Sequence, residues 1–159
     1  MEPRIETIEE KYLIGMSKKM SIADNKTFQL FSTFMPRKKE ILNIKNHDVY
    51  DLIIYPKDYF LTFNPISHFK KHALVEVLNL ENIPEGMESF TLSQGKYAVF
   101  TFKAYVPNQA NFEYIFSKWL PNSDFNLDDR PHFDILSEKI QQRSPDAYQE
   151  IWIPITTKK

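Results

Sequence analysis

The segment EIWIPI (150–155), near the end of the chain, is the first candidate for ligand chemistry. Side chains alternate between the two faces of a strand, so if the three isoleucines face a helix-covered core, Glu150 and Trp152 project from the opposite face. A carboxylate beside an indole offers a negative charge and a π face to an organic cation. The alternative is a glutamate on an edge strand that points into solvent. We expect Glu150 and Trp152 to line a cleft.

A second carboxylate, Glu76, has the same strand setting, between Val75 and Val77. Two carboxylates that approach closely raise the pKa of at least one of them, which suits a general acid or base. A glutamate on the solvent-facing side of a strand is the alternative here too. Glu76 is therefore a candidate partner of Glu150.

Three aromatic residues complete the predicted ligand-binding set. Trp119 lies on the apolar stripe of a predicted helix, where a ring serves either the core or a pocket. Tyr50 and Tyr97 lie on predicted strands, where their hydroxyl groups would orient a ligand. No residue is assigned as a catalytic group or a metal ligand.

The composition excludes several kinds of chemistry. The 159 residues include no cysteine and only three glycines, which removes cysteine-based metal centres and glycine-rich phosphate loops. The formal net charge of −1 gives no field that would recruit nucleic acid or anionic lipid. We expect a single cytoplasmic domain over 1–159 that needs no cofactor or metal and binds neither nucleic acid directly nor a membrane.

The hydrophobic pattern predicts an alternation of strands and helices. The residues 25–43 read as a helix capped by Asp24 and bent at Pro36, and 108–121 as a helix capped by Asn108 and stopped by Pro121. Between the strands lies an aromatic loop, 56–72. Strands are expected over 5–20, 49–55, 74–78, 96–103, 132–137 and 148–155.

The two halves of the chain resemble each other. A shift of 85 positions sets Lys11-Tyr12 on Lys96-Tyr97, and a shift of 74 sets 75–77 beside 149–151, which implies an insertion of 11 residues in the first half. The halves, about 5–80 and 90–155, each read as a strand-helix-strand-strand unit. The predicted fold class is therefore α+β, with an antiparallel sheet, helices on one side, and a ligand cleft near a pseudo-twofold axis.

Five segments in order carry a resemblance to a known family: IPEGME (83–88), GKYAVF (95–100), KWLPNS (118–123), PHFD (131–134) and EIWIPI (150–155). Together they resemble the GyrI-like small-molecule-binding domain, which includes the effector-binding modules of AraC-type and multidrug-sensing regulators. The resemblance implies an aromatic pocket with an acidic residue that takes cationic or amphiphilic compounds. Asp134 and Ile135 depart from the family's glutamate followed by an aromatic, so neither inherits a role.

Three functions follow from this resemblance. The first is capture of a small hydrophobic, cationic molecule with Glu150 as counter-ion. The second is hydrolysis of strained electrophilic natural products, with Glu150 or Glu76 positioning the attacking water. The third is an interaction with a protein such as gyrase. The duplicated unit uses every residue, so we expect any role in transcription regulation to be exercised without a DNA-binding domain of the chain's own.

Overall fold

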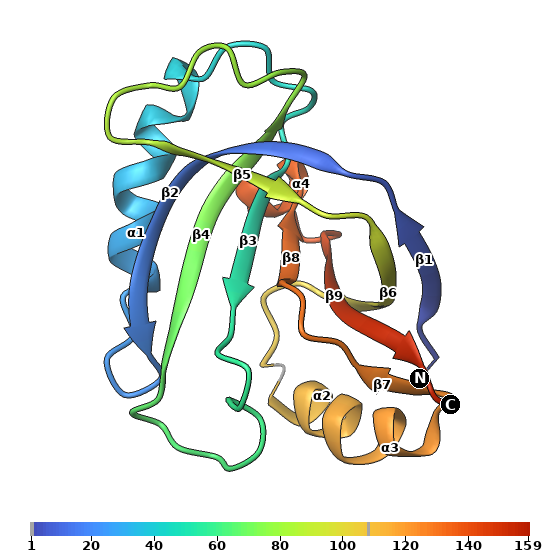
Figure 1. Cartoon of the computed structure of the whole chain (residues 1–159). Helices are drawn as coiled ribbons and strands as arrows, with labels where there is room; N and C mark the ends of the chain where they lie inside the picture. The colour runs from blue at the N-terminus through green and yellow to red at the C-terminus, as the bar shows by residue number, and fades with distance from the viewer. Residues whose placement is uncertain (1, 108) are drawn as a thin grey trace.

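The structure is a computed structural model, and it describes residues 2–107 and 109–159 (Figure 1). The described strands are β1 (Arg4–Ile8), β2 (Lys11–Ser21), β3 (Val49–Ile54), β4 (His68–Val77), β5 (Glu88–Leu92), β6 (Gly95–Lys103), β7 (Phe125–Leu127), β8 (His132–Leu136) and β9 (Tyr148–Thr157). All nine belong to one antiparallel sheet in the order β1-β6-β9-β8-β3-β4-β2-β5, with β7 paired to β9.

The predicted strands are present, and two of them differ from the prediction by more than two residues. The stretch 5–20 is divided into β1 and β2 at Glu9-Glu10. The strand expected at 74–78 starts at His68, inside the predicted loop 56–72, because pairing with β2 extends β4 through its charged residues. The short strands β5 and β7 were not predicted, since five and three residues carry too little periodic signal.

The first helical segment is α1 (Thr27–Phe34), followed by a 3₁₀ helix, η1 (Met35–Glu40). The α-helix ends just before Pro36, as its ring predicts. The 3₁₀ helix η1 ends at Glu40, whereas the sequence predicted a helix that continues to residue 43. Asp24 is not its N-cap: it lies in a turn where its backbone N–H is bound by Ser21 Oγ at 2.9 Å, and Asn25 Oδ1 accepts the N–H of Thr27.

The second helical segment runs through α2 (Gln109–Tyr114), a wider π-helical stretch η2 (Ile115–Trp119) and α3 (Leu120–Asn122). Pro121 lies in its last turn, so the predicted stop is correct to within one residue. The predicted cap Asn108 lies outside the described residues. A short helix that was not predicted, α4 (Glu138–Gln141), is capped by Ser137.

The strand order confirms the duplication. Each half contributes a strand, a helix and two strands, first β2-α1-β3-β4 and then β6-α2-β8-β9, and the halves join where β3 pairs with β8 (Figure 1). The strand before each unit crosses to the other half, because β1 pairs with β6 and β5 pairs with β2. The sheet is thereby strongly curved.

The helices lie on one face of this sheet, as predicted. Asp51 is paired with Ala73 on β4 and with Asp134 on β8, and Asp134 is paired with Ile151 on β9, so these residues share a face. Ala73 packs under α1, and Ile151 packs under α2 and η2. No helix formed by the described residues is long and apolar enough to cross a membrane.

The opposite, concave face is closed by a core of its own. The crossing strands bring Ile8 and Leu92 against residues of both halves, and the buried members are Ile8, Leu13, Tyr50, Leu52, Leu74, Leu92, Tyr97, Val99, Phe133 and Trp152. Helices therefore pack on one face, and side chains of the sheet itself fill the other.

Candidate functional site

Two carboxyl groups face each other at the centre of the molecule. Asp51 on β3 and Asp134 on β8 are directly opposite in the register of these two strands, at the join between the halves. Residues opposite in an antiparallel pair have side chains on the same face, about 5 Å apart at Cβ. Both carboxyl groups therefore rise side by side from the helix-covered face of the sheet.

Each carboxyl group has one polar partner. Lys71 Nζ on β4 lies 3.4 Å from Asp51 Oδ2, and Gln149 Nε2 on β9 donates to Asp134 Oδ2 at 2.8 Å. The second oxygen of Asp51, Oδ1, is buried without a hydrogen-bond partner. Because a buried acceptor without a donor costs about 1–3 kcal/mol, a ligand that donates a hydrogen bond to this oxygen would be stabilised.

Burial governs the ionisation of this pair. It raises the pKa of Asp134 to about 7, an effect strengthened by the charge of Asp51 and opposed by the Gln149 hydrogen bond and by Lys71. Burial also raises the pKa of Asp51, and the charge and hydrogen bond of Lys71 oppose that rise. Lys71 offsets the charge of Asp51 whenever that carboxyl group is ionised, so the floor carries at most one net negative charge.

A cavity of about 1000 Å³ lies over these two carboxyl groups. We call it the central cleft. Its walls come from the turn before α1, from the loop after β3, from α2 and η2, and from the strands β3, β4, β8 and β9. The lining residues are Ile22, Asn25, Asp51, Ile53, Tyr55, Tyr59, Phe60, Phe63, Asn64, Lys71, Phe112, Glu113, Phe116, Ser117, His132, Phe133, Asp134, Ile151 and Ile153.

Aromatic rings make up one wall of the central cleft. Phe60, from the loop after β3, stacks on Phe116 of η2 and on His132 of β8, each with ring centroids 5.4 Å apart. Tyr55 meets Phe60 at 4.7 Å and Tyr59 at 4.6 Å. Burial lowers the pKa of His132 to about 3, so at neutral pH its ring is an uncharged member of this wall.

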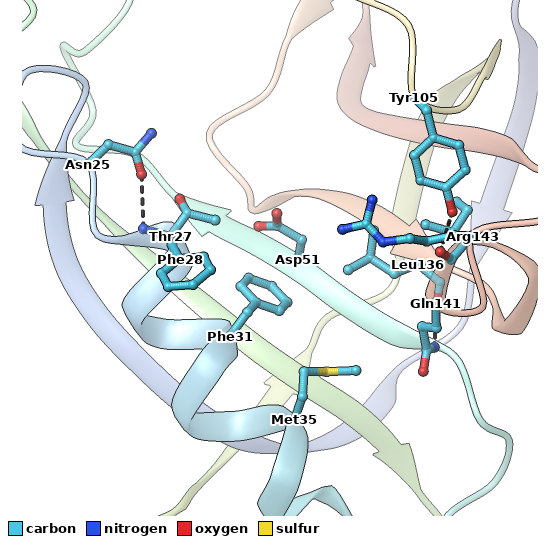
Figure 2. A pocket seen from close by; sticks show the side chains of 11 residues that line it. Asn25, Thr27, Phe28, Phe31, Met35, Asp51, Tyr105, Leu136, Gln141 and Arg143 are labelled. Atoms are coloured by element: carbon cyan, nitrogen blue, oxygen red, sulfur yellow. Dashed lines mark hydrogen bonds between the residues drawn. The ribbon is translucent and has the colours of Figure 1, made fainter.

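A second cavity, of about 680 Å³, adjoins the first; we call it the side chamber. Figure 2 shows its lining residues, which include Phe28 and Phe31 of α1 and Met35 of η1 on one side and Arg143, Gln141 and Tyr105 on the other. Asp51 and Asn25 line both cavities. Asp51 therefore stands at the boundary between them.

The residues predicted from sequence lie elsewhere. Glu150 and Trp152 do face away from the helices, but this face is the packed concave core. Glu150 Oε2 accepts from Arg4 Nη2 at 2.7 Å and its side chain is 31% exposed. Trp152 stacks on Phe133 at 5.2 Å, and its buried Nε1 has no hydrogen-bond partner among the described residues. The central cleft lies on the helix side of the sheet, and a binding role for Glu150 and Trp152 on the opposite face stays a prediction.

The other predicted residues are also held in structural contacts. Glu76 is buried between Lys11 and Lys45, at 3.5 and 3.4 Å. Burial raises the pKa of Tyr50, and the charges of Glu76 and Glu150 both add to that rise. Tyr50 and Tyr97 belong to the concave core, where Tyr97 Oη donates to the carbonyl of Pro131 at 2.8 Å. Trp119, the last residue of η2, packs edge-on against Phe100 and lines a cavity of about 500 Å³ near the start of the chain.

The sequence contained a signal for the two aspartates. Asp51 interrupts the apolar run VYDLII, and Asp134 interrupts HFDIL. A carboxylate within an otherwise buried strand is costly unless it is paired or functional. Neither Asp51 nor Asp134 is among the residues predicted from the sequence, and Asp134 departs from the glutamate that the resemblance implies.

The fold and the central cleft together define a small-molecule-binding domain built from a duplicated unit. A model of the GyrI-like small-molecule-binding domain matches residues 1–156, and the chain belongs to this family. No curated protein matches the chain.

Several solved structures share the fold. The protein SAV2435 bound to tetraphenylphosphonium is 19% identical, with a TM-score of 0.68 over 98% of this chain and 94% of that one. The C-terminal domain of EcmrR is 11% identical, with a TM-score of 0.67 over 97% and 96%. A hydrolase from Listeria innocua is 8% identical, with a TM-score of 0.55 over 98% and 92%. At these identities the likeness establishes the fold alone.

Proposed function

We propose that this protein captures a lipophilic organic cation in the central cleft, with Asp51 and Asp134 as the counter-charge. The observation that carries the proposal is the pair of opposed carboxyl groups on the floor of a cavity of about 1000 Å³ with an aromatic wall. Carboxylates withdrawn from water attract a cation more strongly than exposed ones, and ring faces add cation–π attraction.

The charge at the floor fits one monovalent cation. Lys71 offsets one of the two carboxylates, which leaves at most one negative charge for the ligand. Rings without charge, among them neutral His132, suit the apolar part of such a molecule. The binding of tetraphenylphosphonium by a protein of the same fold makes this cation a suitable first probe.

Titration calorimetry with tetraphenylphosphonium tests the proposal. We expect the wild type to bind and the variants Asp51→Asn and Asp134→Asn each to bind about tenfold more weakly, because each removes charge from a site shielded from water. Glu150→Gln is the matched control, since it removes one carboxylate on the other face of the sheet. Its affinity should stay within about twofold of the wild type.

The same variants test the prediction made for Glu150. If Glu150→Gln loses the affinity while both aspartate variants keep it, the ligand binds on the concave side and the central cleft is not the site. Circular dichroism of each variant would establish that it is folded.

A second candidate function is hydrolysis of a strained electrophilic natural product. One specific observation favours it: Asp134, with its pKa raised to about 7, lies opposite a second carboxyl group. Ionised Asp51 would take the proton of a water whose oxygen bonds to the strained carbon. The broken ring bond would pass its electron pair to a conjugated oxygen, and Asp134 would protonate that oxygen.

This candidate predicts a product heavier than the substrate by one water. Incubation with a cyclopropane-containing electrophile, followed by mass spectrometry, should show it with the wild type and at least tenfold less with Asp51→Asn. Product formed at equal rates by both proteins would exclude the proposed chemistry.

We further propose that ligand capture serves effector sensing or sequestration in the bacterial cytoplasm. Pull-down from a bacterial lysate with and without tetraphenylphosphonium would show whether a partner associates in a ligand-dependent way.

A further inference from the structure

The side chamber has features that the capture of a simple cation does not use. Its walls are apolar, with Phe28 and Phe31 of α1 facing Leu136 and Ile140. The ring of Phe28 is 84% exposed, an unusual position for a phenylalanine beside a cavity. An apolar group of a ligand placed here would cover it.

The polar groups of the side chamber have opposite charges. Asp51 contributes its buried and unpartnered Oδ1 at the boundary with the central cleft. Arg143 contributes a guanidinium group for which the described part of the chain provides neither an ion pair nor a hydrogen bond. Figure 2 shows this guanidinium extending past Leu136 into the chamber, toward the side on which Asp51 lies.

The backbone around Arg143 is strained. Among the described residues, only three that are not glycine have a positive φ, and two of these line the side chamber: Tyr105 at 66° and Arg143 at 56°. Such conformations cost about 1 kcal/mol or more and tend to occur where side chains serve a ligand.

Several hydrogen bonds hold this strained wall in place. Tyr105 Oη donates to the carbonyl of Ile140, and Gln141 Nε2 donates to the carbonyls of Leu136 at 2.8 Å and His47 at 2.9 Å. Lys38 Nζ donates to Gln141 Oε1 at 2.9 Å, which connects α4 to η1. The backbone of Arg143 is held at the end of α4, where its N–H donates to the carbonyl of Ile140 at 3.0 Å and the next N–H, of Ser144, donates to the carbonyl of Lys139 at 2.9 Å.

We propose that the ligand is dipolar: a cationic group over Asp51 and Asp134 is joined, through an apolar part lying in the side chamber, to an anionic group held by Arg143. This inference rests on the proposed function and names the class of molecule that fits the same site. A ligand of this kind would satisfy Asp51 Oδ1 and Arg143 at once, which a simple cation cannot do.

Rhodamine B and its ethyl ester form a matched pair of probes. The acid is a zwitterion and the ester is a cation of nearly the same shape, so their comparison isolates the anionic group. Fluorescence anisotropy would be measured with the wild type and with the variants Asp51→Asn, Arg143→Gln and Lys139→Gln. Lys139 is the matched control because it is an exposed cation of α4 that pairs with Asp146 and does not line the chamber.

The wild type should bind the acid about fivefold more tightly than the ester. Arg143→Gln should lose this preference while its affinity for the ester stays within about twofold, and Lys139→Gln should keep the preference. Tight binding of the ester with no preference for the acid would overturn the dipolar ligand and leave the proposed function standing. Failure of both dyes to bind would overturn the dipolar ligand and the proposed function together. Binding of the dyes that is unchanged in Asp51→Asn would do the same.

Discussion

At the level of single residues, the central cleft removes ionisable groups from the water that would stabilise their charged forms. Asp134 is the clearest case, since burial and the neighbouring charge of Asp51 raise its pKa to about 7. The folded protein therefore holds this proton more tightly than the unfolded chain, in which an aspartate has a pKa near 4. It follows that Asp134 makes the fold less stable as the pH rises from about 4 to about 7.

Asp134→Asn should therefore stabilise the protein at pH 8, by about 1–3 kcal/mol, because it removes a buried charge and keeps an oxygen that accepts from Gln149. At about pH 4 the difference should be small, since Asp134 is then protonated. Urea denaturation at the two pH values measures the effect. The surface variant Asp146→Asn should show no such stabilisation, because Ser144 and Lys139 lower the pKa of Asp146 to about 2. A less stable Asp134→Asn at pH 8 would contradict this account.

At the level of elements, the loop between β3 and β4 joins the two halves across the central cleft. It leaves the first half after Ile54 and places the ring of Phe60 between Phe116 and His132 of the second half. Ring pairs of this kind contribute about 0.5–1.5 kcal/mol each beyond the area they bury. The loop is therefore part of the aromatic wall, although 44% of Phe60 remains exposed.

Phe60→Ala should destabilise the protein by about 1–2 kcal/mol and weaken the binding of tetraphenylphosphonium several-fold, because the central cleft loses a stacked ring. Leu61→Ala is the control from the same loop, with a side chain that is 84% exposed. Chemical denaturation and calorimetry of both variants measure the two effects. Equal behaviour of the two variants would show that the loop does not form the wall of the site.

At the level of the whole molecule, the crossing strands make the two halves depend on each other. Ile8 of β1 packs in the concave core with Tyr97 and Trp152, which belong to the second half. In the same way, β5 precedes the second half but pairs with β2 of the first. Neither half closes its concave face by itself, so the chain should unfold as one cooperative unit.

Ile8→Ala should cost about 2–3 kcal/mol, because it opens a cavity in the core shared by both halves. Ile5→Ala, three positions away on β1, should cost less than about 1 kcal/mol, since Ile5 is 43% exposed. Tryptophan fluorescence and circular dichroism during urea unfolding should give coincident transitions for both variants. A separate early transition in Ile8→Ala would show that the halves are independent.

The sequence by itself determined the local structure and the duplication. Alternation in segments such as EIWIPI specified the strands, the ring of Pro36 ended α1, and the order of elements in the two halves gave the fold class. These features depend on neighbours along the chain or on a repeated pattern, and both can be read from residue types and spacing.

Only the tertiary structure decided which face of the sheet carries the central cleft. Alternation showed that Glu150 and Ile151 point to opposite faces, but both faces of this sheet are partly apolar, and the pattern does not say which one is packed shut. The crossing of β1 and β5 closes the concave face, and the pairing of β3 with β8 sets Asp51 beside Asp134 across 83 positions of the chain. Such contacts arise from the closure of the sheet, which residue spacing does not encode.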